Sequence, residues 1–126
     1  EETHHLIGAK ELAAMKPSAK IINVSRGAII DEAALVEALQ NGAIAGAALD
    51  VYSQEPLNKE NHPMRALFDM ENVLLSPHLT FYTDEAMARL EEETLQRCME
   101  VLQGEPVMIK STDPRLQRQS KGVRFI

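Results

Sequence analysis

The stretch Ile44-Ala45-Gly46-Ala47-Ala48-Leu49-Asp50-Val51 decides the fold of this chain. It is small and apolar along almost its whole length, which is typical of a parallel strand buried on both faces. Its small residues indicate that helices pack closely against it. An acid at the end of such a run is rarely left without a partner, so we expect Asp50 to have a functional or hydrogen-bonded role.

Two more apolar runs lie on either side of this strand in the sequence, Ala19–Val24 before it and Asn72–Leu75 after it. Segments with helical spacing or helix-capping residues separate and flank the strands. They are Gly8–Met15, a helix that begins after the N-cap Asp31 and ends at Asn41-Gly42, a helical turn at Met64–Phe68, and a long helix from Thr83 to Gly104. The order α-β-α-β-β-α predicts an α/β fold with a parallel sheet.

Polar residues follow each predicted strand. Arg26 follows the first, Asp50 and Glu55 follow the second, and His78 follows the third. Ligands of open α/β sheets bind outside the carboxyl ends of the strands, so we expect these four side chains on one rim, with Arg26 opening onto the same cleft as His78.

Their chemistry fits hydride transfer to a keto acid. Arg26 could hold a carboxylate with two hydrogen bonds, and His78 could donate or accept a proton near neutral pH. Glu55 beside His78 would orient the imidazole and favour its protonated form, which predicts a hydrogen bond between the two side chains. Taken singly, each residue also has a structural interpretation: a surface arginine, a structural histidine and a solvated glutamate.

Composition excludes several classes of protein. The 126 residues suffice for one domain, and 13 Lys+Arg against 19 Asp+Glu argue against binding to nucleic acid. The apolar runs are too short to span a membrane, and no signal peptide is visible. Cys98 is the one cysteine, so a disulfide within the chain is excluded, which is consistent with a cytoplasmic setting. We expect Cys98 to be a small core or boundary residue. No zinc-ligand spacing, G-x-S-x-G elbow or P-loop is present, and we predict no metal site.

Seven stretches occur in one order that identifies a family. They are Thr3–Ile7, Met15–Pro17, Ile22–Ala28, Asp31-Glu32, Gly46–Val51, Glu55–Leu57 and Asn72–His78. In these motifs and their spacing the chain resembles the D-isomer-specific 2-hydroxyacid dehydrogenases over about two-thirds of its length. The resemblance implies NAD or NADP as cofactor, a small 2-hydroxy or 2-keto acid as substrate, and a homodimer.

The resemblance also implies roles for individual residues. Arg26 would hold the substrate carboxylate, His78 would be the general acid in reduction and the base in oxidation, and Glu55 would keep His78 protonated. The cofactor-binding positions would be Val24, Ser25, Arg26, Asp50 and His78, with Asp50 at the nicotinamide end.

The family's glycine-rich G-x-G-x-x-G turn is absent from this sequence, as is its substrate domain. We therefore expect residues 1–104 to form the C-terminal half of a three-layer, Rossmann-like dinucleotide-binding domain, with the strand Ala19–Val24 left with one open edge. Residues 105–126 would be an arm that crosses to the substrate domain, and the isolated chain would be inactive. Two alternatives stay open: a non-catalytic binding or regulatory module, as in the family's transcriptional corepressors, and a stand-alone domain that pairs through its sheet edge.

Overall fold

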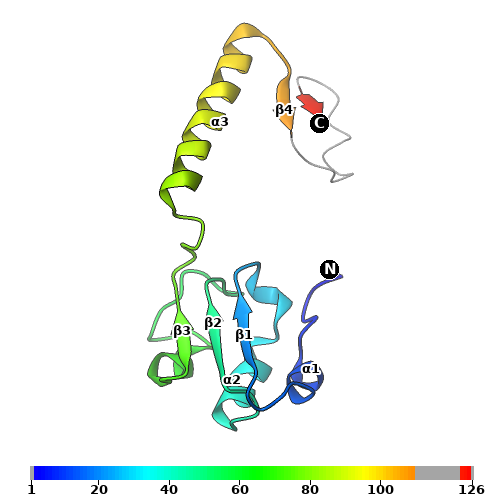
Figure 1. The fold of residues 1–126 in the computed structure, drawn as a ribbon, viewed down its shortest axis with the longest axis vertical. Coiled ribbons are helices and arrows are strands. Elements are labelled where there is room, and N and C mark those ends of the chain that lie inside the picture. The colour runs from blue at the N-terminus through cyan, green and yellow to red at the C-terminus, as the bar shows by residue number, and fades with distance from the viewer. Residues whose placement is uncertain (1, 110–122, 126) are drawn as a thin grey trace. The chain divides into compact units, whose positions relative to one another are not determined.

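The computed structural model describes residues 2–109 and 123–125. The chain divides into two compact units, Glu1–Phe81 and Tyr82–Ile126, and each is described by itself. Figure 1 shows a small sheet with short helices in the first unit, and one long helix followed by a strand pair in the second. The predicted boundary after residue 104, between the dinucleotide-binding domain and the arm, stays a prediction.

The first unit is built on a three-stranded parallel sheet. Strands β1 (Lys20–Asn23), β2 (Gly46–Leu49) and β3 (Val73–Leu75) lie in the order β1-β2-β3. In the register of the sheet, Ile22 lies opposite Ala48, which lies opposite Leu74. The predicted α/β class and parallel pairing are confirmed. Among the described residues β1 pairs only with β2, so its other edge is open, as expected.

The unit has four short helices: α1 (Ala9–Ala13) precedes β1, the 3₁₀ helix η1 (Gly27–Ile29) and α2 (Glu32–Gln40) connect β1 to β2, and the 3₁₀ helix η2 (Arg65–Asp69) connects β2 to β3. The predicted limits of α2 are confirmed. Asp31 Oδ1 accepts the backbone N–H groups of Ala33 and Ala34 at 3.1 and 3.2 Å, and Gly42 follows the helix with a φ of +66°. Helix α1 is shorter than the predicted Gly8–Met15.

The core lies on one face of the sheet. Leu12 of α1, Leu35 and Leu39 of α2, and Met64 and Leu67 around η2 pack there and are almost completely buried. On the opposite face, Ile22 and Leu74 are 70% and 68% exposed. The second strand was predicted to be buried on both faces. Within Glu1–Phe81 only one face is covered, because the helices of this unit all contribute to the same core.

The second unit begins with helix α3 (Asp84–Gln103), whose ends match the prediction. Thr83 Oγ1 accepts the Ala86 N–H at 3.2 Å, and Gly104 ends the helix with a φ of +72°. Strands β4 (Val107–Ile109) and β5 (Val123–Phe125) then pair in parallel, which the sequence had not predicted. The rest of the expected arm over residues 105–126 lies outside the described residues, apart from 105 and 106.

Cys98 on α3 is exposed, so its expected place in a core or at its boundary is wrong for this unit. The apolar spacing of the helix had suggested burial, but Leu95, Val101 and Leu102 on the same helix are also exposed. None of the helices in the described part of the chain is both long and apolar enough to cross a membrane.

Candidate active site

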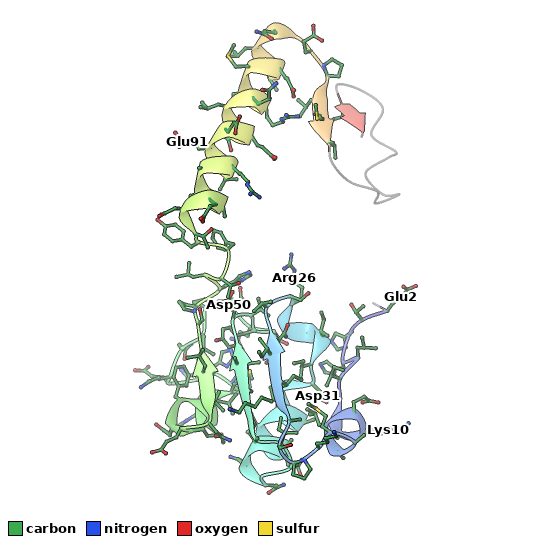
Figure 2. The ribbon with its side chains drawn as sticks, in the orientation of Figure 1. Glu2, Lys10, Arg26, Asp31, Asp50 and Glu91 are labelled. Atoms are coloured by element: carbon green, nitrogen blue, oxygen red, sulfur yellow. The ribbon has the colours of Figure 1, made fainter. Side chains whose placement is uncertain are left out.

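The turn after β1 is shaped by the side chain of Asn23. Its Oδ1 accepts the Ser25 N–H at 3.1 Å, and its Nδ2 donates to the Arg26 carbonyl at 2.9 Å. Figure 2 shows Arg26 beyond the end of β1, at the carboxyl ends of the strands, where Asp50 also lies. The Arg26 side chain is exposed, and its Nη1 donates to the Ser25 carbonyl at 2.7 Å.

Glu55 and His78 form the predicted pair. Nδ1 of His78 lies 3.1 and 3.0 Å from Oε1 and Oε2 of Glu55. The Tyr52 N–H donates to Glu55 Oε1 at 3.1 Å and fixes the carboxylate from the other side. The hydrogen bond from His78, followed by that from the Tyr52 backbone, lowers the pKa of Glu55 below its usual range, so this carboxylate stays charged.

His78 has an uncommon backbone conformation. Its φ of +59° is left-handed, a region that few residues other than glycine adopt, although histidine is enriched among those that do. The two residues after it are tied to Asp50: Leu79 N–H donates to Oδ1 at 2.8 Å, and Thr80 donates to Oδ2 from its N–H and its hydroxyl, at 3.1 and 2.7 Å. These bonds hold the turn that presents His78.

Asp50 therefore has a structural role, because its carboxylate is hydrogen-bonded to other residues of the chain. Its side chain is buried, with 2% of its surface exposed. Burial alone would raise the pKa of Asp50, but hydrogen bonds from Ser76, Thr80 and Leu79 outweigh burial and hold this pKa well below its usual range. The sequence predicted a hydrogen-bonded or functional role, and the hydrogen-bonded role is confirmed. Its contact with a nicotinamide stays a prediction.

Tyr52 joins the loops after β2 and β3. Its hydroxyl lies 2.9 Å from the Leu49 carbonyl and 2.8 Å from the Ser76 carbonyl. Burial raises the pKa of the Tyr52 hydroxyl, so it remains protonated and can donate to these carbonyls. Neither Tyr52 nor Asn23 was expected at the site from the sequence. A single aromatic or amide residue after a strand gives no signal of such cross-links.

A cavity of about 300 Å³ lies beside the pair, lined by Tyr52, Glu55, Pro56, Leu57, Pro77 and His78. Arg26 does not line it, contrary to the expectation that it opens onto the same cleft, and its guanidinium donates to the neighbouring Ser25 carbonyl. The structure thus brings Glu55 and His78 together and leaves Arg26 on the same edge of the sheet but outside this cavity. No group of three His, Cys, Asp or Glu side chains suited to a metal ion occurs among residues 2–109 and 123–125.

A parallel α/β sheet with a carboxylate–histidine pair at the carboxyl ends of its strands defines the class of dinucleotide-binding domains found in dehydrogenases. Residues 1–80 match the family model described as D-isomer specific 2-hydroxyacid dehydrogenase, NAD binding domain. The chain belongs to this family.

Relatives agree with this assignment. The glyoxylate reductase of Thermococcus litoralis is 45% identical over 105 residues, which is 83% of this chain and 30% of that protein. The structure of a D-lactate dehydrogenase with NAD+ from Lactobacillus jensenii has a TM-score of 0.73 at 32% identity, covering 84% of this chain and 34% of that one. The structure of an NADPH-dependent glyoxylate/hydroxypyruvate reductase from Sinorhizobium meliloti, in complex with NADP and malonate, has a TM-score of 0.68 at 38% identity. The match covers 79% of this chain and 30% of that one. The chain thus spans about a third of the length of these relatives.

Homologous proteins bind NAD or NADP, and the family resemblance predicts the nicotinamide end of such a cofactor at the carboxyl ends of these strands. Val24 and Ser25 are exposed immediately after β1, but the backbone N–H and carbonyl of Ser25 are already hydrogen-bonded to Asn23 and Arg26. At Asp50 the fit is poorer, because the donors from Ser76, Leu79 and Thr80 already occupy the acceptor positions of this buried carboxylate. The cofactor contacts of Val24, Ser25 and Asp50 stay predictions.

Proposed function

We propose that the protein containing this chain is an NAD(P)-dependent oxidoreductase that transfers a hydride between the nicotinamide and a small D-2-hydroxy acid or 2-keto acid. The observation that carries the proposal is the contact between Glu55 and His78, with His78 Nδ1 3.0 Å from the nearer carboxylate oxygen. The pair lies beside a cavity at the ligand-binding edge of an α/β sheet, where a proton donor is required for reduction of a carbonyl.

In this proposal the two ring nitrogens of His78 have different tasks. Because Nδ1 faces Glu55, Nε2 is the nitrogen available to a substrate. In the reduction, Nε2–H donates a proton to the carbonyl oxygen of the keto acid; in the oxidation, neutral Nε2 removes the proton of the hydroxyl group. Glu55 stabilises the imidazolium throughout. A bound reduced nicotinamide would supply the hydride.

Arg26 would bind the carboxylate of the substrate. Its guanidinium is exposed and donates to a neighbouring carbonyl, a partner that a substrate carboxylate can replace with two charge-assisted bonds. Val24 and Ser25 would line the nicotinamide pocket, with Asp50 and His78 beside it. A homodimer and a cytoplasmic location belong to the same proposal, on the family resemblance and on the single cysteine.

The test uses the full-length protein with NADH and NADPH and with glyoxylate, pyruvate and hydroxypyruvate as acceptors. We expect turnover, and we expect His78→Asn to lower kcat/KM by about 10²- to 10⁴-fold, the range for loss of a general acid. His4→Asn, at an exposed histidine, is the matched control and should leave the rate unchanged. Cofactor binding without turnover would instead indicate a non-catalytic module, and full activity in His78→Asn would refute the assigned role.

A further inference from the structure

His62 is a buried histidine that the proposed reaction does not use. Only 2% of its surface is exposed, and it does not line the cavity beside His78. Its Nδ1 lies 3.1 Å from the Met64 backbone nitrogen, and its Nε2 lies 2.8 Å from the Gln54 carbonyl oxygen. A backbone N–H needs an unprotonated acceptor and a carbonyl needs a donor, so the ring is neutral with its proton on Nε2.

The loop that carries Glu55 depends on such side-chain contacts. Between β2 and η2 the described chain has no helix or strand. Immediately before Glu55, the Ser53 N–H donates to Glu32 Oε1 at 2.6 Å, and the Gln54 carbonyl accepts from His62. The two residues before the carboxylate are therefore held by two different side chains, Glu32 from α2 and His62 from further along the same loop.

His62 also contacts the residue that holds the carboxylate directly. Its ring packs edge-on against the Tyr52 ring, with centroids 6.0 Å apart and an interplanar angle of 81°. The Tyr52 N–H donates to Glu55 Oε1, and its hydroxyl reaches the Ser76 carbonyl, two residues before His78. Through Gln54 and Tyr52, His62 contacts both neighbours that determine where the Glu55 carboxylate lies.

We propose that His62 is a positioning residue for the proton-transfer pair: by fixing Gln54 and Tyr52 it holds the Glu55 carboxylate against His78 Nδ1. The inference rests on the proposed function of Glu55 and His78. His62 touches neither substrate nor cofactor in this role. Its contribution is geometric, and a displacement of about 1 Å at a reacting group can cost on the order of 100-fold in rate.

Two substitutions separate the two hydrogen bonds of His62. In His62→Asn, the shorter side chain can still accept the Met64 N–H, as asparagine does in turns, but its amide does not reach the Gln54 carbonyl. In His62→Gln, the longer side chain places an amide N–H donor where Nε2–H is. In the full-length protein we expect His62→Asn to lower kcat/KM about 10- to 100-fold, and His62→Gln to stay within about 3-fold of wild type because the donor to Gln54 is restored.

A double-mutant cycle identifies Glu55 as the group through which His62 acts. In a Glu55→Gln background, His62→Asn should lower kcat/KM by no more than about 2-fold further, because the two residues act as a unit. If the losses in kcat/KM caused by the two single substitutions simply multiply in the double variant, the proposal is overturned. So would wild-type activity in His62→Asn, or a large loss of activity in a folded His62→Gln.

A second measurement does not depend on turnover. In hydrogen exchange followed by mass spectrometry on the full-length protein, peptides covering residues 51–57 should exchange faster in His62→Asn than in wild type or His62→Gln, with peptides from α2 unchanged. If the wild-type protein reduces no keto acid, the proposed function fails, yet exchange still tests the positioning. Unchanged exchange at 51–57 in His62→Asn would refute it, as would loss of protection there in His62→Gln.

Discussion

Gly27 sits where two loops of the candidate site come closest. It follows Arg26 and packs against the backbone of the loop after β2, so that a Cβ at this position would lie 2.0 Å from the Tyr52 carbonyl carbon and 2.2 Å from the Ser53 nitrogen. Ordinary contact begins at 3.4 Å, so in Gly27→Ala the two backbones must separate by about 1.4 Å, the difference from 2.0 Å.

That separation moves Arg26 away from the residues that hold Glu55. Because a misplacement of about 1 Å can cost on the order of 100-fold, we expect kcat/KM for keto-acid reduction by the full-length protein to fall about 100-fold, or about 2.7 kcal/mol of transition-state stabilisation. The assay is steady-state oxidation of the reduced cofactor with the best of the three keto acids.

Gly8→Ala is the matched control. The nearest atom to a Cβ at Gly8 is 3.5 Å away, which is ordinary contact, so this variant should keep wild-type kinetics. The thermal midpoints of both variants are measured alongside. A Gly27→Ala protein that keeps kcat/KM within about 3-fold of wild type would refute the argument that close approach at Gly27 sets the geometry of the site.

Three further predictions follow from the contacts of the first unit. Glu55→Gln removes the charge that favours the His78 imidazolium, so the decline of keto-acid reduction with rising pH should begin at lower pH than in wild type. Glu60→Gln, in the same loop, is the control. An unchanged pH profile in Glu55→Gln would contradict the proposal that Glu55 and His78 act as a proton-transfer pair. Asp50 has a pKa below its ordinary value of 3.8 in the folded protein, so its stabilisation is present above that pH and lost as pH falls below it. Asp50→Asn should therefore lower the urea midpoint near pH 7 and flatten its fall in acid; equal slopes in both proteins would refute this. Leu35 is completely buried, so Leu35→Ala should lower the free energy of unfolding by about 2–5 kcal/mol, against less than about 0.5 kcal/mol for the exposed Leu6→Ala.

Much of the first unit could be predicted because its signals are local. Asp31 caps α2 through atoms within three residues, and Gly42 ends it through its own backbone conformation. The small, apolar run around β2 predicted a strand of a parallel sheet, and the sheet places it between β1 and β3. The pairing of Glu55 with His78 was also anticipated, since both follow strands that end at one edge, and the family resemblance strengthened that expectation.

Other features depend on packing that spacing in the sequence does not reveal. Asn72–Leu75 was predicted as a strand, but nothing in its residues showed that Leu74 would face solvent. Cys98 lies at an apolar helical position and is nevertheless exposed. Which face of an element is covered depends on what packs there, and the local pattern shows only that one face is apolar.

The sequence by itself determined the α/β class, the strand order along the chain and the residue types of the candidate site. Tertiary structure alone decided how those residues are held. Asp50 binds the turn that carries His78 across 29 and 30 residues, and Tyr52 reaches Ser76 across 24. Hydrogen bonds over such separations form only when the sheet has brought the loops together, because no local preference of the chain specifies their partners.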